Sequence, residues 1–179
     1  NPDMTLQTIE GDSTFVKELL TDGKCDIAFL RSESSSVKEF NSIPYMIDYL
    51  TAVLPATHPL AKADNLPFEQ LRGETFLLFP EHSFINDLCI RECRNAGFEP
   101  HIAYTGNRGA TLIDLVRNGA GITLMMHHSA RQENDSSLAF IPVTPGIYSY
   151  ISLNYAKEKP LSPQAESFVR YVKAHKRDF

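Results

Sequence analysis

The chain has 179 residues, of which 42% are apolar, and a formal net charge of −5. This length and composition allow a buried core of one large or two small domains, and no apolar run approaches the roughly 18 residues of a membrane-spanning helix. The acidic balance makes this piece a poor nucleic-acid binder by itself, because phosphate backbones are bound by clustered positive charge.

The first part of the chain is expected to form a strand, a helix and a second strand. Met4 to Ile9 alternates apolar and polar residues, which predicts a strand. Ser13 is the expected cap of a helix that runs to Asp22-Gly23, because its hydroxyl can accept a hydrogen bond from an amide two or three residues on. The apolar run from Cys25 to Leu30 then predicts a buried parallel strand, and a polar surface loop follows at residues 31–36.

The middle of the chain continues this alternation, with prolines and glycines at the expected ends of the elements. The predicted elements are a strand at 49–55, a short helix at 67–71, a strand at 75–79, a helix at about 84–95 and a strand at 101–105.

A second helix, stop and strand unit follows between Ala110 and His128. Leu112, Leu115 and Val116 fall at helical spacing, Asn118-Gly119 supplies the stop, and 122–126 is an unbroken apolar run. The chain then predicts strands at 138–143 and 148–155, and a last helix that Ser162-Pro163 begins.

The two helix, stop and strand units lie about 95 residues apart and predict two lobes of similar build, each with its own sheet. We expect the chain to cross between the lobes near Ile47-Asp48 and again near Ser149-Tyr150. Lobe one would then contain residues 1–47 and 150–179, and lobe two would contain residues 48–149. The order of elements makes the fold class α/β, with a cleft between the lobes.

Several longer runs, taken together and in this order, closely resemble the effector-binding domain of LysR-type transcriptional regulators. The runs are GKCDIAFLR at 23–31, LTAVLPATHPLA at 50–61, LRGETFLLF at 71–79, AGFEP at 96–100, NGAGITLMM at 118–126 and LSPQAESFVRYV at 161–172. The resemblance implies two Rossmann-like lobes joined by two crossover segments, as in type II periplasmic binding proteins, with a small-molecule effector between the lobes.

That resemblance also implies partners outside this sequence. Such regulators carry a winged helix-turn-helix domain upstream, through which they bind DNA as homodimers or tetramers. The family's domains usually begin with a further strand and helix, so that lobe one looks incomplete here. We therefore expect a ligand-sensing, non-enzymatic and cytoplasmic module with no cofactor and no membrane partner. The alternatives are an extracytoplasmic solute-binding protein of a transporter and, less favoured, an enzyme on the same fold.

Ligands gather at the carboxyl ends of parallel strands, where helix N-termini offer unsatisfied N–H groups. The sequence predicts three such junctions, at 11–14, 81–83 and 106–109. If all three meet at one cleft, they would favour binding of a small carboxylate. The candidate ligand-binding residues are Ser13, Arg31, His82, Ser83, Asn107, Arg108 and Met125. For Ser13, which the resemblance places in the effector site, the alternative is a plain helix cap. For Arg31 and Arg108, the alternative to ligand binding is a solvated surface charge. For Met125, the alternative is a role in the core.

The sequence gives little support for a catalytic site or a metal site. His82 and Ser83 are adjacent without a third orienting group, which disfavours a nucleophilic triad. His127 and His128 would point opposite ways on an extended chain, so that no metal site is expected.

The three cysteines, Cys25, Cys89 and Cys93, are odd in number and do not have the spacing of metal ligands. A reduced cytoplasmic chain is the simplest explanation of this pattern. A disulfide between Cys89 and Cys93 would strain a helix, so we expect buried or half-buried thiols, with a reactive thiol as the alternative.

Overall fold

The computed structural model describes residues 5–131 and 135–175 of the chain, which divides into two compact units. The first unit consists of Asn1–Ile47 and Ser149–Phe179, and the second consists of Asp48–Tyr148. The elements in chain order are α1 (Ser13–Thr21), β1 (Ala28–Ser32), β2 (Asn41–Pro55), η1 (Pro59–Lys62), β3 (Leu66–Pro67), η2 (Phe68–Leu71), β4 (Thr75–Leu78), α2 (Phe84–Asn95), β5 (His101–Thr105), α3 (Gly109–Arg117), β6 (Thr123–Met126), α4 (His127–Ala130), β7 (Leu138–Thr144), β8 (Tyr148–Tyr155) and α5 (Pro163–Ala174).

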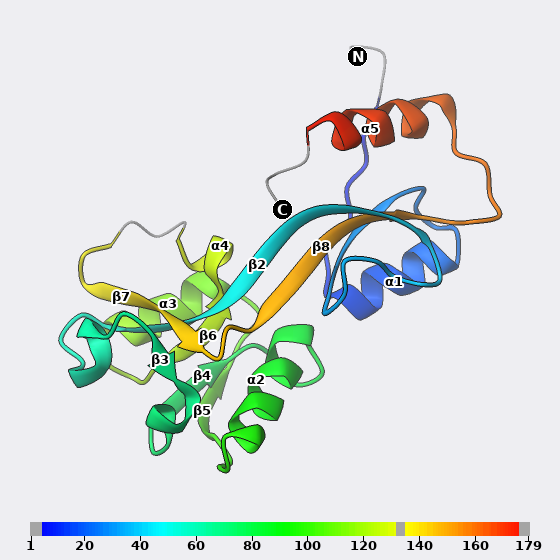
Figure 1. Cartoon of the computed structure of the whole chain (residues 1–179). Coiled ribbons are helices and arrows are strands. Elements are labelled where there is room, and N and C mark those ends of the chain that lie inside the picture. Colours follow the sequence, from blue (N-terminus) through cyan, green and yellow to red (C-terminus); the bar gives the residue numbers. More distant parts are fainter. Residues whose placement is uncertain (1–4, 132–134, 176–179) are drawn as a thin grey trace. The chain divides into compact units, whose positions relative to one another are not determined.

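The first unit is built on three strands in the order β1, β8, β2. β8 lies in the middle and pairs antiparallel with β1. Leu20 of α1 packs with Leu30 of β1 in one apolar cluster, while Val169 and Val172 of α5 pack with Leu153 of β8 in another. Figure 1 shows α1 and α5 on opposite faces of these strands. Each helix therefore buries its apolar face against one side of the same sheet.

The second unit continues along β2, whose later half pairs antiparallel with both β6 and β7. β3 adds to β7 in parallel, and β4 pairs in parallel with β5. A parallel bridge between Phe76 and Ile122 joins β4 to the start of β6. The main core of this unit includes Leu50, Phe76 and Leu124, and a second cluster lies under α3.

Several predicted elements are confirmed by the structure. The helix expected at 84–95 is α2, the strands expected at 101–105 and 148–155 are β5 and β8, and β6 is buried along its whole length. Ser162 caps α5, because its side chain accepts a hydrogen bond from the amide of Ala165. Strong apolar periods between clear stop signals were sufficient for these elements.

The prediction of a strand at Met4 to Ile9 is wrong for the part that the structure describes. Residues 5–10 are exposed and belong to no strand, and Met4 itself lies outside the described residues. An alternating pattern forms a strand only where another strand offers hydrogen bonds, and among the described residues none pairs with this segment.

The strand expected at Cys25 to Leu30 begins later and pairs differently. β1 starts at Ala28 and runs to Ser32, at the end of the strand order and antiparallel to β8. Phe29 keeps 43% of its surface exposed. The prediction of a parallel strand buried on both faces is therefore wrong, because one face of β1 is only partly covered.

The expectation of a separate sheet for each lobe is also wrong. β2 is a single strand of 15 residues that belongs to both units, Asn41–Ile47 to the first and Asp48–Pro55 to the second. The hydrogen-bonded strand order consequently runs without a break from β1 through β8 and β2 to β7 and β3.

Candidate functional site

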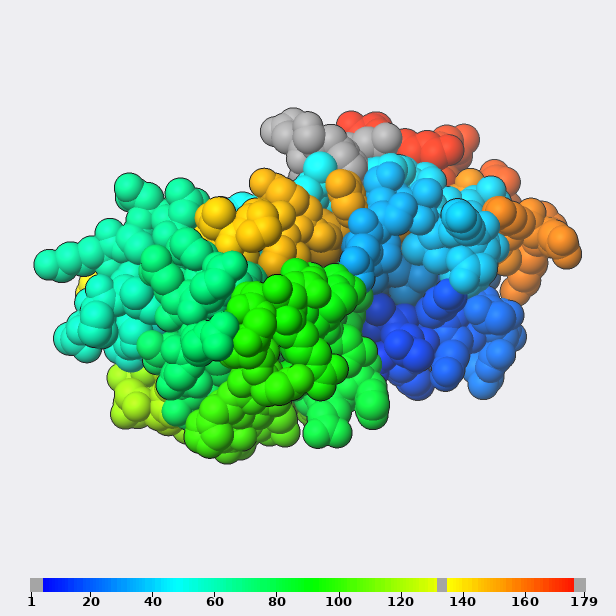
Figure 2. Space-filling view, turned by 60° about the horizontal axis from the view of Figure 1, so that its bottom comes forward, coloured from blue at the N-terminus to red at the C-terminus, as the bar shows by residue number. Residues whose placement is uncertain are grey.

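Two helices of the second unit begin at the same edge of its parallel strands. Leu78 at the end of β4 is paired with Thr105 at the end of β5, and the amide of Gly106 donates a hydrogen bond of 3.0 Å to the carbonyl of Leu78. The connections that follow, 79–83 and 106–108, therefore leave from one edge and lead into α2 and α3. Figure 2 shows α2, in green, at the surface of this unit. Helix N-termini at a strand edge favour anions.

The connection into α2 is fixed by hydrogen bonds of its own. The Ser83 hydroxyl donates to the carbonyl of Pro80 at 2.7 Å and accepts from the amide of Asn86 at 3.3 Å. Asn86, which is 3% exposed, donates from Nδ2 to the carbonyl of Phe79 at 2.8 Å. Ser83 is thus the N-cap of α2, and its hydroxyl is already paired within the loop.

His82 lies next to this cap in an unusual backbone conformation. Its φ of 65° falls in the left-handed region that favours glycine, and its side chain is exposed. The neighbouring Ser83 hydroxyl donates to the backbone carbonyl of Pro80 and accepts from the backbone amide of Asn86.

The start of α3 differs from the start of α2 because the side chain of its N-cap residue does not cap its backbone amides. Arg108 is the N-cap of α3, and its side chain makes no cap hydrogen bond. Asn107 and Arg108 are both exposed. A Cβ added at Gly109 would lie 3.7 Å from both Met125 Cε and Phe79 Cζ, so these two side chains lie close to the beginning of the helix. The arrangement combines a cation with the positive end of a helix dipole.

Met125 lies beneath this edge rather than on it. Its side chain has no exposed surface and packs in the cluster that includes Val53, Leu77 and Leu112. The described structure thus places Met125 in the core, where it packs with the apolar face of α3.

Two of the candidate residues belong to the first unit. Ser13 is not the helix cap: Asp12 caps α1, and its Oδ1 accepts hydrogen bonds from the amides of Thr14 at 2.9 Å and Phe15 at 3.0 Å. Ser13 is instead the first residue of α1 and is half-buried. Arg31 lies on β1, where its Nη1 donates to the hydroxyl of the buried Ser149 at 2.6 Å.

The candidates therefore fall into two groups. His82, Ser83, Asn107 and Arg108 lie in the second unit at one strand edge, with Met125 below them, whereas Ser13 and Arg31 lie in the first unit.

Sequence reasoning missed Asn86, which ties the first turn of α2 to the end of β4. Its position three residues after the cap was the only available signal.

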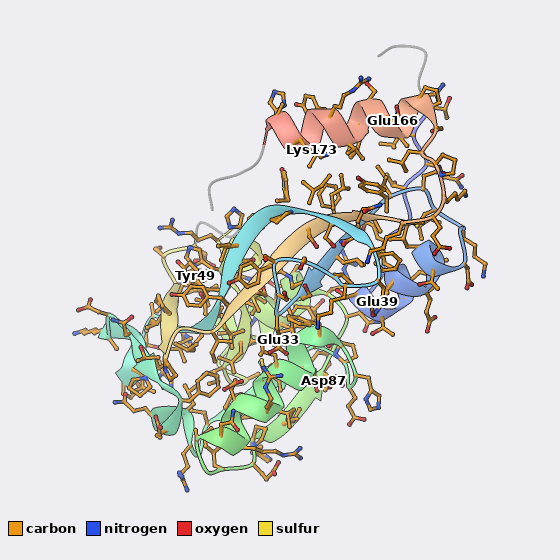
Figure 3. The ribbon with its side chains drawn as sticks, turned by 45° about the vertical axis from the view of Figure 1, so that its right-hand side comes forward. Glu33, Glu39, Tyr49, Asp87, Glu166 and Lys173 are labelled. Carbon is orange, nitrogen blue, oxygen red and sulfur yellow. The ribbon has the colours of Figure 1, made fainter. Side chains whose placement is uncertain are left out.

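A second group that the sequence did not reveal surrounds Asp48 and Tyr49 on β2. Oδ1 of Asp48 accepts from the amides of Tyr49 at 3.0 Å and His128 at 3.1 Å. The ring of His127 stacks on that of Tyr49, and Figure 3 labels Tyr49 in this region. Burial raises the pKa of the Tyr49 phenol, and burial followed by the charge of Arg131 lowers the pKa of His127.

The thiols are buried or partly buried, as their pKa values reflect. Burial raises the pKa of Cys89 well above its ordinary value and that of Cys93 to about 12. Cys25 is half-exposed, and burial raises its pKa as well. Residues 5–131 and 135–175 contain no group of three or more His, Cys, Asp or Glu side chains placed to hold a metal ion, and no helix there is long and apolar enough to cross a membrane.

Comparison with known proteins gives one consistent result. A sequence model of the LysR substrate binding domain matches residues 1–177. The chain is 26% identical over 164 residues to the transcriptional dual regulator GltC of Bacillus subtilis, an alignment that covers 91% of this chain and 55% of that protein. It is 27% identical over 175 residues to the HTH-type regulator YwbI of the same organism, covering 97% of this chain and 58% of that protein. The chain thus spans little more than half of these relatives.

Solved structures agree with this result at the level of the fold. The regulatory domain of Synechocystis PCC6803 CcmR, solved in complex with 2-PG, is similar with a TM-score of 0.83 and 16% identity, over 93% of this chain and 81% of that one. Likeness at this identity concerns the fold alone. It confirms the expected α/β fold of the periplasmic-binding-protein-like type.

Proposed function

The chain belongs to the LysR substrate-binding domain family, and from this membership we propose that it senses a small-molecule effector within a longer transcriptional regulator. The family match over residues 1–177 carries the proposal, and relatives such as GltC are named as transcriptional regulators. In this proposal a DNA-binding domain elsewhere in the protein contacts the DNA in the cytoplasm, and the regulator works as a homodimer or tetramer.

We place one contact of the effector at the start of α3. The cap of this helix uses no side-chain hydrogen bond, and the exposed Arg108 adds a positive charge beside it. A helix N-terminus contributes roughly 0.3 to 1 kcal/mol to a nearby anion, and a charge-assisted hydrogen bond contributes about 1.5 to 3 kcal/mol. These magnitudes favour a carboxylate or a similar small anion. Ser13 and Arg31 are proposed as separate contacts on the first unit.

The proposed role is regulatory rather than catalytic. The hydroxyl of Ser83, which follows His82 in the chain, is paired with the Pro80 carbonyl. A ligand of such a domain acts by preferring one of two conformations, and it shifts their populations by the difference in its affinity for them. The signal therefore requires binding energy and no turnover.

A screen of small carboxylates, aromatic acids and amino acids for a raised melting temperature tests the proposal, because any ligand of the folded state stabilises it. For a ligand found in this way, calorimetry on Arg108→Ala should show affinity about 10-fold weaker. Arg94→Ala is the matched control, since Arg94 is an exposed arginine in the last turn of α2, where it pairs with Glu99. Ser13→Ala tests the contact proposed on the first unit.

Three results would contradict the proposal. A screen in which no small molecule raises the melting temperature would argue against effector binding by this domain. Equal affinity of Arg108→Ala and the parent chain would remove Arg108 from the site. Chemical conversion of the ligand by the purified chain, followed by mass spectrometry, would show an enzyme instead of a sensor.

A further inference from the structure

A buried carboxylate lies at the point where the chain passes from the first unit to the second. Asp48 is the first residue of the second unit and only 1% of its surface is exposed. Its Oδ1 accepts hydrogen bonds from the amide of Tyr49, next to it on β2, and from the amide of His128, 80 residues further along the chain. A buried carboxylate is costly unless such donors surround it, so this geometry ties the two segments firmly together.

The short helix α4 depends on this contact for its beginning. Met126 is the N-cap of α4 and makes no side-chain cap hydrogen bond, so Asp48 supplies from another strand the acceptor that a cap residue would provide. Two further contacts join the same segments, the ring stack of His127 on Tyr49 and the approach of His127 Nδ1 to Thr51 Oγ1 at 3.3 Å. Figure 1 shows α4 beside β2.

β6 leads into α4 without an intervening loop, since β6 ends at Met126 and α4 begins at His127. One residue earlier, Met125 packs in one apolar cluster with Leu112 of α3. A continuous set of contacts therefore runs from the apolar face of α3 through the carboxyl end of β6 to Asp48. Each contact in this set lies within the second unit.

We propose that Asp48 is a positioning residue that couples the carboxyl end of β6 to the first crossing of the chain between the two units. A shift of the end of β6 moves the amide of His128. Because that amide is hydrogen-bonded to the Asp48 side chain, the shift also displaces the backbone of Asp48, where the second unit begins. The coupling is a property of the packing in this unit and does not depend on which ligand, if any, the domain binds. Its failure would leave the effector proposal intact, and the reverse is also true.

Amide hydrogen exchange in the 179-residue chain tests the hydrogen bonds themselves. Asp48→Ala should speed the exchange of the Tyr49 and His128 amides about 10-fold or more relative to the other amides of the second unit. Asp48→Asn keeps an acceptor oxygen and should restore most of the protection. Asp12→Ala is the matched control, since it removes another carboxylate that accepts from two amides, and it should leave the Tyr49 and His128 amides unchanged. Unchanged protection in Asp48→Ala, or equal acceleration of all amides, would overturn the proposal.

Chemical shifts in an NMR spectrum test the coupling. Met125→Leu alters the packing at the end of β6 with little change in volume. In the parent chain this substitution should move the amide resonances of Ile47, Asp48 and His128. In the Asp48→Ala background the shifts at Ile47 and at residue 48 should disappear while that of His128 remains. The proposal would be overturned if the resonances of Ile47 and Asp48 did not move in the parent chain, a result that requires no variant at Asp48. It would also be overturned if the resonances of Ile47 and residue 48 moved equally in both backgrounds.

Discussion

The imidazole ring of His127 stacks on the phenol ring of Tyr49, with ring centroids 4.3 Å apart and an interplanar angle of 21°. Nδ1 of the same imidazole lies 3.3 Å from Oγ1 of Thr51. Burial, together with the nearby charge of Arg131, holds the pKa of His127 below its ordinary value of 6.5. The folded chain therefore favours the neutral ring.

This pKa shift predicts a pH-dependent stability. As the pH falls below 6.5, the unfolded chain binds a proton at His127 before the folded chain does, so the free energy of unfolding decreases. Above that pH both states are neutral and the effect is absent. Urea unfolding at about pH 8 and about pH 5.5 should show a larger loss of stability for the parent chain than for His127→Gln. The exposed His101→Gln is the control, and equal losses in the parent and His127→Gln would contradict the prediction.

The cap of α1 predicts different outcomes for two neighbouring residues. Asp12 accepts from two amides of the first turn, so that Asp12→Ala should lower the free energy of unfolding by about 1 kcal/mol. Asp12→Asn should retain most of this contribution, whereas Ser13→Ala should change stability by no more than a few tenths of a kcal/mol. Urea titration of the three variants measures the differences. A larger loss for Ser13→Ala than for Asp12→Ala would show that the cap is misassigned.

The cysteines should react in a fixed order. Cys25 is half-exposed while Cys89 and Cys93 have no exposed surface, and burial raises the pKa of both buried thiols. Because the thiolate is the reactive form, a thiol reagent at about pH 8 should modify Cys25 first and the other two only after unfolding. Mass spectrometry of peptides locates the modified residue. Labelling in urea serves as the control for all three, and rapid labelling of Cys89 or Cys93 in the folded chain would refute the order.

The buried amide of Asn86 should be important for the connection into α2. Asn86→Ala removes the hydrogen bond to the carbonyl of Phe79 and leaves that acceptor without this donor, which should cost about 1 to 3 kcal/mol. Asn95→Ala removes an exposed hydrogen bond to Glu92 on the same helix and should cost less than about 0.5 kcal/mol. Chemical denaturation compares the two variants, and similar losses would mean that burial of Asn86 is unimportant.

The elements that could be predicted from the sequence are those whose signals are local. The helix at 84–95 has its serine cap and its glycine stop within the same short stretch, and its bounds are confirmed by α2. The sequence predicts Ser13 as the cap of α1, but Asp12 and Ser13 are both good acceptors on adjacent residues. Sequence preference alone does not distinguish them, and the backbone geometry selects Asp12.

Features that depend on distant partners could not be predicted in the same way. The orientation of β1 is set by its pairing with β8, more than 100 residues later, and nothing in the run from Cys25 to Leu30 encodes that neighbour. The contact of Asp48 with His128 is of the same kind. For the candidate site, the sequence indicated which loops lie at the strand ends, but it did not show that the Ser83 hydroxyl is paired with Pro80 or that Met125 is covered.

The central place of β8 in the first unit has a consequence for the order of events during synthesis. β1 and β2 leave the ribosome early, yet the strand that hydrogen-bonds between them is among the last parts of this sequence to be translated. Nearly all of the second unit is available before that strand exists. A shortened chain that ends at Tyr148 and is released from the ribosome should therefore protect the second unit from proteolysis while the first unit is still cleaved.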